Sequence, residues 1–171
     1  SYVAGVYYPD KTRVGWWKNG YPEYFAKVLN ATNWIGIHLH VDGEELDLAT
    51  AAVSQFKRVL NMREGILQRS FVATLASGKQ IEVQATRFIS IVDTDNAVIR
   101  YTVKALNFSG RLCFTPLLDL NVVNQDSNYD EQFWGEISRV TQLGSAALTG
   151  ETKKTAFHVA TAFALALEVD G

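Results

Sequence analysis

Apolar and polar residues alternate along much of this chain with the two-residue period of a β-strand that has one buried and one wet face. The clearest alternation has apolar residues at Ile35, Ile37, Leu39 and Val41. Asp42-Gly43 follows directly, and further apolar residues come after it. Asp-Gly between two such runs predicts a hairpin with a type I′ turn, which needs positive φ at both central residues.

The same alternation recurs downstream between polar turn segments. Residues 66–75 are rich in apolar and β-branched side chains and lie between the turns predicted at 63–65 and 76–78. Residues 98–105 alternate again after the polar turn 93–96. From this pattern we expect a core that contains Ile35, Ile37, Leu39, Ile81, Val83, Tyr101 and Val103.

Other segments are less regular. Residues 133–143 and 157–169 are predicted strands, although the alanines of the second also permit a helix. Residues 23–29 are compatible with one or two helical turns, and 124–131 is a polar stretch without periodicity. Many strands at this spacing predict an all-β fold, an antiparallel β-sandwich or barrel, over residues 1–171 as a single domain.

Composition and charge exclude several classes of protein. With 171 residues, of which 47% are hydrophobic, the chain is too apolar for a disordered tail. The net charge of −2 comes without a basic stripe, so we expect no nucleic-acid partner. No apolar run is long enough to span a bilayer, and we expect no membrane partner. The only cysteine, Cys113, is expected to be a buried inert thiol, and it leaves cytoplasm and periplasm both open.

Two polar clusters are candidate sites. His38 and His40 lie two apart on a predicted strand and share a face, so they would bind a metal if a third ligand converged, or else they face solvent. Glu44, Glu45 and Asp47 follow the predicted turn, where carboxylates serve either glycosidic hydrolysis or solubility. We favour the solvent-facing reading of both clusters, and expect neither a catalytic residue nor a metal site.

Aromatic residues gather in the two irregular segments 9–30 and 124–134. Aromatic rings stack on the C–H faces of sugars, and neighbouring polar groups bind hydroxyls. The candidate contact residues are Trp16, Trp17, Tyr21, Phe133 and Trp134. Such rings contact either carbohydrate or another part of the protein, or they close the ends of their own sandwich.

A set of short strings occurs in a fixed order from Val3 to Asn124. They are 3–7, 33–36, 41–44 with 46–48, 60–67 with Arg69, 87–90, Tyr101, 106–110, and 118–119 with Val122 and Asn124. Together they resemble the N-terminal domain of glycoside hydrolase family 65, which includes maltose, trehalose and kojibiose phosphorylases and related hydrolases. Asn61 departs from the aspartate usual in the family, and segment 9–30 is longer and more aromatic.

The resemblance implies a super-sandwich similar to galactose mutarotase-like domains, and we expect it to be incomplete here at its N-terminal edge. In such proteins a helical linker and an (α/α)6 barrel follow, and the barrel carries the general-acid glutamate while phosphate or water attacks with inversion. We therefore expect a non-catalytic fragment of a longer bacterial enzyme that acts on α-glucosidic disaccharides. The implied partners are the C-terminal barrel, carbohydrate and a second copy in a homodimer. No cofactor is implied, and inorganic phosphate would be a co-substrate of a phosphorylase.

The segments 9–30 and 124–134 are then expected to face the barrel or the sugar pocket. Two alternatives stay open. The first is an independent carbohydrate-binding module that uses Trp16, Trp17 and Tyr21 as a stacking platform. The second is a small enzyme of mutarotase type, which would need His38 or His40 to converge with a carboxylate.

Overall fold

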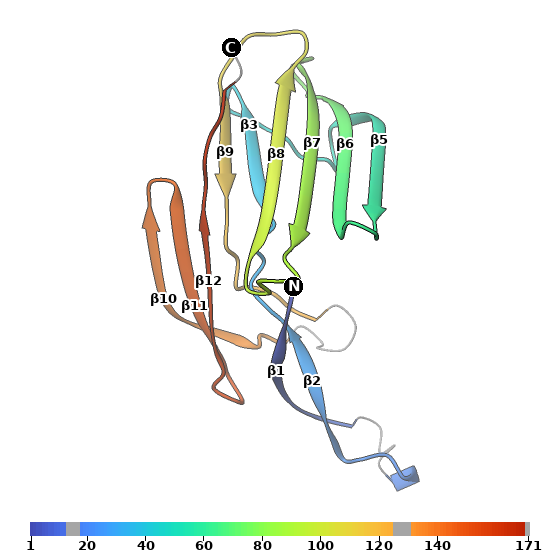
Figure 1. Ribbon diagram of the computed structural model, residues 1–171, viewed down its shortest axis with the longest axis vertical. Helices are drawn as coiled ribbons and strands as arrows, with labels where there is room; N and C mark the ends of the chain where they lie inside the picture. The colour runs from blue at the N-terminus through green and yellow to red at the C-terminus, as the bar shows by residue number, and fades with distance from the viewer. Residues whose placement is uncertain (13–17, 125–130, 170–171) are drawn as a thin grey trace. The chain divides into compact units, whose positions relative to one another are not determined.

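The structure is a computed structural model that describes residues 1–12, 18–124 and 131–169. Its long elements within these ranges are β-strands, and every strand pair with a defined register is antiparallel (Figure 1). The chain forms two compact units. Unit 1 comprises Ser1–Gly36 and Pro116–Gly171, and unit 2 comprises Ile37–Thr115. The all-β antiparallel prediction is confirmed.

Unit 2 contains two sheets. The first has the order β5-β6-β7-β8, in which neighbours along the chain pair with one another. These strands are β5 (Ala52–Asn61), β6 (Ile66–Thr74), β7 (Gln80–Ile89) and β8 (Ala97–Ala105). The second has the order β4-β3-β9, from β3 (Ile37–Val41), β4 (Glu44–Glu45) and β9 (Leu112–Pro116).

The two sheets of unit 2 share one hydrophobic core. Its buried members come from β3, β6 and β7 and from the turn after β6, and they are Leu39, Val41, Phe71, Ala73, Leu75, Ile81 and Val83. Half-buried side chains of β8 and β9, among them Tyr101 and Phe114, pack against this cluster. A core filled from the facing sides of two antiparallel sheets is a β-sandwich, as predicted.

The turn between β3 and β4 has the predicted conformation. Asp42 has φ 50° and Gly43 has φ 88°, so both central residues are left-handed. Aspartate tolerates this region better than most residues, and glycine adopts it without a steric penalty. The type I′ prediction from the Asp-Gly pair is confirmed.

Unit 1 combines both ends of the chain. Its ribbon pairs β1 (Tyr2–Lys11) with β2 (Tyr24–Asn30), and its three-stranded sheet has the order β10-β11-β12. The sheet strands are β10 (Trp134–Gln142), β11 (Ser145–Thr152) and β12 (His158–Ala164). The core of unit 1 contains Val6, Tyr8, Leu29, Ala31, Phe133 and Trp134.

One local prediction needs revision, and one open alternative is decided. The helical turns considered for 23–29 are wrong, because this segment forms β2. Lys27 occupies an inward position there and is only 5% exposed, so a charged residue interrupts the apolar alternation. Segment 157–169 contains the strand β12, which excludes the helical alternative over His158–Ala164.

The predicted core is mostly correct. Leu39, Ile81 and Val83 are buried, and Tyr101 and Val103 pack against them. Ile37 is half-buried as the first residue of β3. Ile35 was predicted wrongly, since it is 41% exposed. It lies before β3 begins, where the strand period no longer fixes the direction of the side chain.

Candidate functional site

The predicted contact aromatics fall into three groups. Trp16 and Trp17 lie outside the described residues. Tyr21 lies between β1 and β2 and is 63% exposed. Phe133 and Trp134 stand at the start of β10 and are 0% and 6% exposed. Tyr21 is therefore available on the surface, whereas Phe133 and Trp134 belong to the core of unit 1.

Phe133 and Trp134 are anchored by specific contacts. The Phe133 ring meets the Tyr8 ring edge to face, with 5.1 Å between centroids and 78° between planes. The Trp134 Nε1–H donates to the Asn30 carbonyl at 2.7 Å. These contacts join β10 to the β1–β2 ribbon, as in the alternative that the aromatics close their own unit. Contact with substrate or with another domain stays a prediction.

Charged side chains lie around these rings in ion pairs. Lys27 pairs with Asp10, and its ammonium stands 5.9 Å from the centroid of the Phe133 ring. Lys154 lies 2.6 Å from Glu131 and 4.4 Å from the centroid of the Tyr8 ring. Each cation is thus placed between a carboxylate and an aromatic face, the arrangement in which cation–π attraction adds to the ion pair.

The environment of this cluster changes two pKa values. Burial raises the pKa of Tyr8 above its ordinary value, and the nearby carboxylates of Glu131 and Asp10 act in the same direction. Burial alone would raise the pKa of Glu131, but the hydrogen bond and the positive charge of Lys154, with a contribution from Tyr8, together outweigh burial and hold that pKa below its usual range. Glu131 is thus held as an anion and Tyr8 as a neutral phenol, and neither is poised to exchange a proton near neutral pH.

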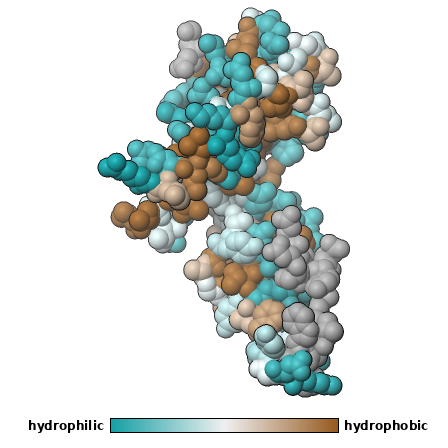
Figure 2. Space-filling view, turned by 90° about the vertical axis from the view of Figure 1, so that its right-hand side faces the viewer, coloured by the Kyte–Doolittle hydropathy of each residue, from teal (hydrophilic) through white to brown (hydrophobic). Residues whose placement is uncertain are grey.

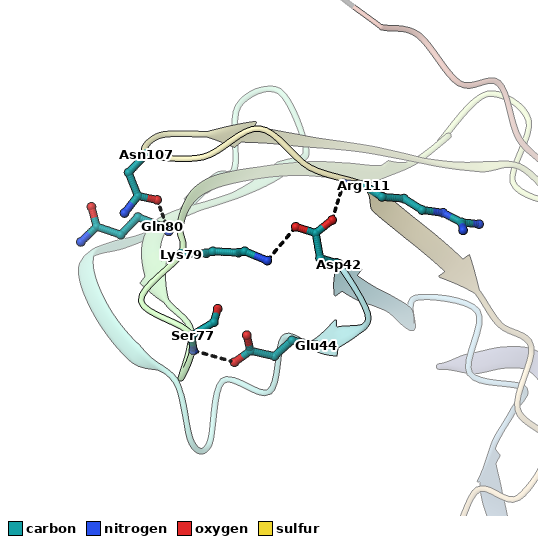
Figure 3. A network of polar contacts seen from close by, with 7 residues as sticks. All are labelled: Asp42, Glu44, Ser77, Lys79, Gln80, Asn107 and Arg111. Carbon is teal, nitrogen blue, oxygen red and sulfur yellow. Dashed lines mark hydrogen bonds and ion pairs between the residues drawn. The ribbon is translucent and has the colours of Figure 1, made fainter.

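Unit 2 has a polar network at the turns between its strands (Figure 3). Asp42 accepts hydrogen bonds from the Lys79 ammonium at 2.6 Å and from the Arg111 backbone N–H at 2.7 Å. These bonds hold the pKa of Asp42 below its usual range. Glu44 accepts a hydrogen bond from the Ser77 backbone N–H at 3.4 Å, and its pKa is lowered by hydrogen bonds from Ser77.

Asn107 continues this network. Its Oδ1 accepts from the Gln80 N–H at 2.7 Å, and its Nδ2 donates to the Gly78 carbonyl at 3.0 Å (Figure 3). At Gly110 an added Cβ would lie 2.3 Å from Asp42 Oδ2, so only glycine leaves room for that carboxylate. The strings 41–44 and 106–110 therefore meet in space and fix the turns of unit 2, a structural role that the sequence pattern did not reveal.

Of the candidate histidines and carboxylates on β3 and β4, one pair is in contact. His38 Nδ1 lies 2.6 Å from Glu45 Oε1, and both side chains are about half exposed. Glu44 is bonded to Ser77 instead, so the two adjacent carboxylates have different partners. In the part of the chain that the structure describes, no group of three or more His, Cys, Asp or Glu side chains is arranged to hold a metal ion.

Two further surface features offer no catalytic group. Cys113 was predicted to be buried, which is wrong: it is exposed, because Leu112 and Phe114 on either side take the inward positions of β9. A shallow groove of about 210 Å³ on the three-stranded sheet of unit 1 has an uncharged lining of Val140, Gln142, Ser145, Ala146, Ala147, Ala162 and Phe163.

No helix among the described residues is long and apolar enough to cross a membrane.

The chain is similar to known proteins over its whole length. The family described as glycosyl hydrolase family 65, N-terminal domain, matches residues 1–171. A maltose phosphorylase from Bacillus subtilis is 46% identical over 92% of this chain and 21% of its own length. A kojibiose phosphorylase from Thermoanaerobacter brockii is 36% identical over 72% of this chain and 15% of its own length.

The fold is also shared with a solved structure. A protein from the human microbiome assigned as a kojibiose phosphorylase superposes with a TM-score of 0.82 at 23% identity, covering 99% of this chain and 22% of its own. This chain spans about a fifth of the length of the maltose phosphorylase and of the solved structure. With the family matching every residue, the chain belongs to the N-terminal domain of glycosyl hydrolase family 65.

Proposed function

We propose that this chain is the non-catalytic N-terminal domain of a longer inverting disaccharide phosphorylase. The observation that carries the proposal is the family match over residues 1–171, together with relatives named as phosphorylases that extend far beyond the matched region. Maltose is the first substrate to test, because the relative with 46% identity is named a maltose phosphorylase. Inorganic phosphate would be the co-substrate of such an enzyme.

The chemistry of the described residues supports a non-catalytic role. Phosphorolysis by inversion needs a carboxylic acid positioned to protonate the leaving oxygen. Asp42, Glu44 and Glu131 are instead held as anions by hydrogen bonds and have lowered pKa values. We infer that the general acid belongs to a helical barrel elsewhere in the longer protein, and that this domain supports that barrel and the mouth of its pocket.

The test compares this chain with the longer protein that contains it. Each is incubated with maltose, trehalose or kojibiose and with inorganic phosphate, and glucose 1-phosphate is measured. We expect release by the longer protein with one of these sugars and none by the 171-residue chain. Sustained release by a contaminant-free sample of the short chain would contradict the proposal, as would a longer protein inactive on all three sugars.

A second candidate function, an independent carbohydrate-binding module, draws on the exposed rings of Tyr21, Tyr24 and Phe25, which are 63%, 55% and 45% exposed. Tyr24 and Phe25 are neighbours on β2 and project to opposite faces, so they do not form one flat platform. Isothermal titration of the chain with maltose tests this candidate. Saturable binding that Tyr21→Ala abolishes would favour it over the first.

A further inference from the structure

The core face of the four-stranded sheet in unit 2 carries an unusual group of arginines. Phe71 on β6 and Val83 on β7 point into the core, and side chains at steps of two residues share that face. The same face therefore presents Arg69 and Arg87 further along these strands. The strand register sets Arg58 of β5 directly opposite Arg69 of β6. Arg87 of β7 stands opposite Leu67, and is therefore the diagonal neighbour of Arg69 on the same face.

These three guanidinium groups have no carboxylate partner among the residues that the structure describes. Arg58 and Arg69 lie over the rings of Phe56 and Phe71, at 5.8 Å and 5.5 Å from the centroids. Arg69 and Arg87 are only partly exposed. Like charges directly opposite on a sheet repel one another, and a partly buried guanidinium without an anion has lost hydration that nothing replaces.

Some other cations among the described residues have carboxylate partners. Ion pairs with carboxylates hold Lys11, Lys27, Lys79, Arg139 and Lys154. Arg63, Arg100 and Lys104 also form no ion pair with a carboxylate of the described residues, but they are exposed to solvent. Arg69 and Arg87, in contrast, are partly buried. Partly buried cations without an anion are expected on a surface that receives its anions from elsewhere.

Exposed apolar side chains border the arginines. Phe56, Leu60 and Ile89 are 51%, 62% and 62% exposed, and nine of the ten residues of β5 are exposed. Figure 2, seen from the side on which β5 lies in Figure 1, shows hydrophobic surface interspersed with hydrophilic surface. Contiguous exposed apolar residues with a charged centre mark protein interaction sites in soluble proteins.

We propose that the arginine face, defined as Arg58, Arg69 and Arg87 with their apolar neighbours Phe56, Leu60 and Ile89, docks an acidic and partly apolar polypeptide segment of the longer protein. Guanidinium groups match carboxylates in bidentate geometry, and the apolar border takes the rest of the segment. This proposal rests on the proposed function in one respect, because it requires a longer chain. The relatives support a longer chain, since this one spans 21% of the length of the maltose phosphorylase.

Charge also argues against other occupants. A two-fold contact between copies would place the same arginines against one another, so a symmetric dimer through this face is disfavoured. Three arginines on a chain with a net charge of −2 are a weak attraction for a nucleic-acid backbone. A carboxylate-bearing segment is the occupant that satisfies both the charges and the apolar border.

Zero-length cross-linking in the longer protein tests this proposal. Arg69→Lys keeps the positive charge and introduces a primary amine, which a carbodiimide joins to a carboxylate in contact as an amide. The control is Arg100→Lys, exposed on the opposite, polar face of the same sheet. Mass spectrometry should find position 69 joined to an aspartate or glutamate beyond residue 171, and no such product at position 100.

Melting temperatures give a second, independent outcome. Arg69→Gln removes one of three repelling charges, so we expect an unchanged or higher melting temperature in the 171-residue chain. The same substitution should lower the melting temperature of the longer protein by about 2 °C or more, because a docked anion loses its partner.

Two results would overturn the arginine face as a docking site. One is a cross-link from position 69 only to carboxylates within residues 1–171, or only to a second copy. The other is an equal thermal shift of Arg69→Gln in both proteins. Neither result depends on catalytic activity. An active phosphorylase without the cross-link would refute the docking site and leave the proposed function standing. An inactive protein with the cross-link would support the docking site and contradict the proposed function.

Discussion

The pair Ile81→Ala and Ile89→Ala tests the sandwich core of unit 2 with the same change at two depths. Both residues lie on β7 and, eight positions apart, on the same face of the sheet. Ile81 is 0% exposed and belongs to the core cluster, whereas Ile89 is 62% exposed. Residue type, strand and face are matched, so burial is the main variable.

The magnitudes follow from the buried surface. Isoleucine to alanine removes three carbon atoms, worth about 2.4 kcal/mol at about 0.8 kcal/mol per buried carbon. The cavity left at Ile81 adds to this loss, so we expect about 2–5 kcal/mol. At Ile89 little more than a third of the side chain is buried, and we expect about 1 kcal/mol or less.

Chemical unfolding of the 171-residue chain, followed by circular dichroism, measures the loss of unfolding free energy at each position. Thermal unfolding of the same variants measures the shift in melting temperature. The melting temperature should fall by about 5–15 °C for Ile81→Ala and by about 3 °C or less for Ile89→Ala. Equal losses at the two positions would refute the assignment of the core. In the longer protein the cost at Ile89 should rise, because Ile89 belongs to the arginine face.

Three further predictions test separate features. Asp42 has a lowered pKa, so its stabilising contribution is present above the ordinary aspartate pKa and is lost as the pH falls through the folded-state value. Asp42→Asn should therefore destabilise the chain near pH 6, and unfolding titrations should show the difference shrinking as the pH is lowered below about 4. Gly43→Ala should cost about 1–2 kcal/mol because φ is 88° there, whereas Gly135→Ala, with no neighbouring atom closer than 4.0 Å to an added Cβ and no positive φ, should not destabilise the chain by thermal melting. Trp134→Phe removes the donor to the Asn30 carbonyl and should cost about 1–3 kcal/mol, and unchanged unfolding would show that water replaces this bond.

Local rules predicted the fold well where strand period and turn chemistry agreed. The run at 35–41 ended at an Asp-Gly pair, and the structure has the strand Ile37–Val41 with a type I′ turn after it. The prediction failed at β2 because Lys27 takes an inward position. A lysine is tolerated there since Asp10 and the Phe133 ring compensate its charge, and both come from distant parts of the sequence.

The candidate site was less predictable than the fold. Cys113 alternates with two apolar neighbours, and the sequence does not say which of the two faces is covered. Likewise, the sequence places Arg58, Arg69 and Arg87 on separate strands, and only the register brings them together. Period identifies a strand, whereas strand pairing decides which charges meet, and pairing is a property of the whole sheet.

The division of the chain into units has a consequence for synthesis on the ribosome. Unit 2 is one continuous segment, so all its strands are available once residue 115 has left the exit tunnel. The apolar residues Val6, Tyr8 and Leu29 of the first ribbon, however, are buried against Phe133 and Trp134. At about 5–20 residues per second those partners arrive some 6–25 s after Tyr8, so the nascent ribbon stays uncovered during that interval and is a natural client for a chaperone.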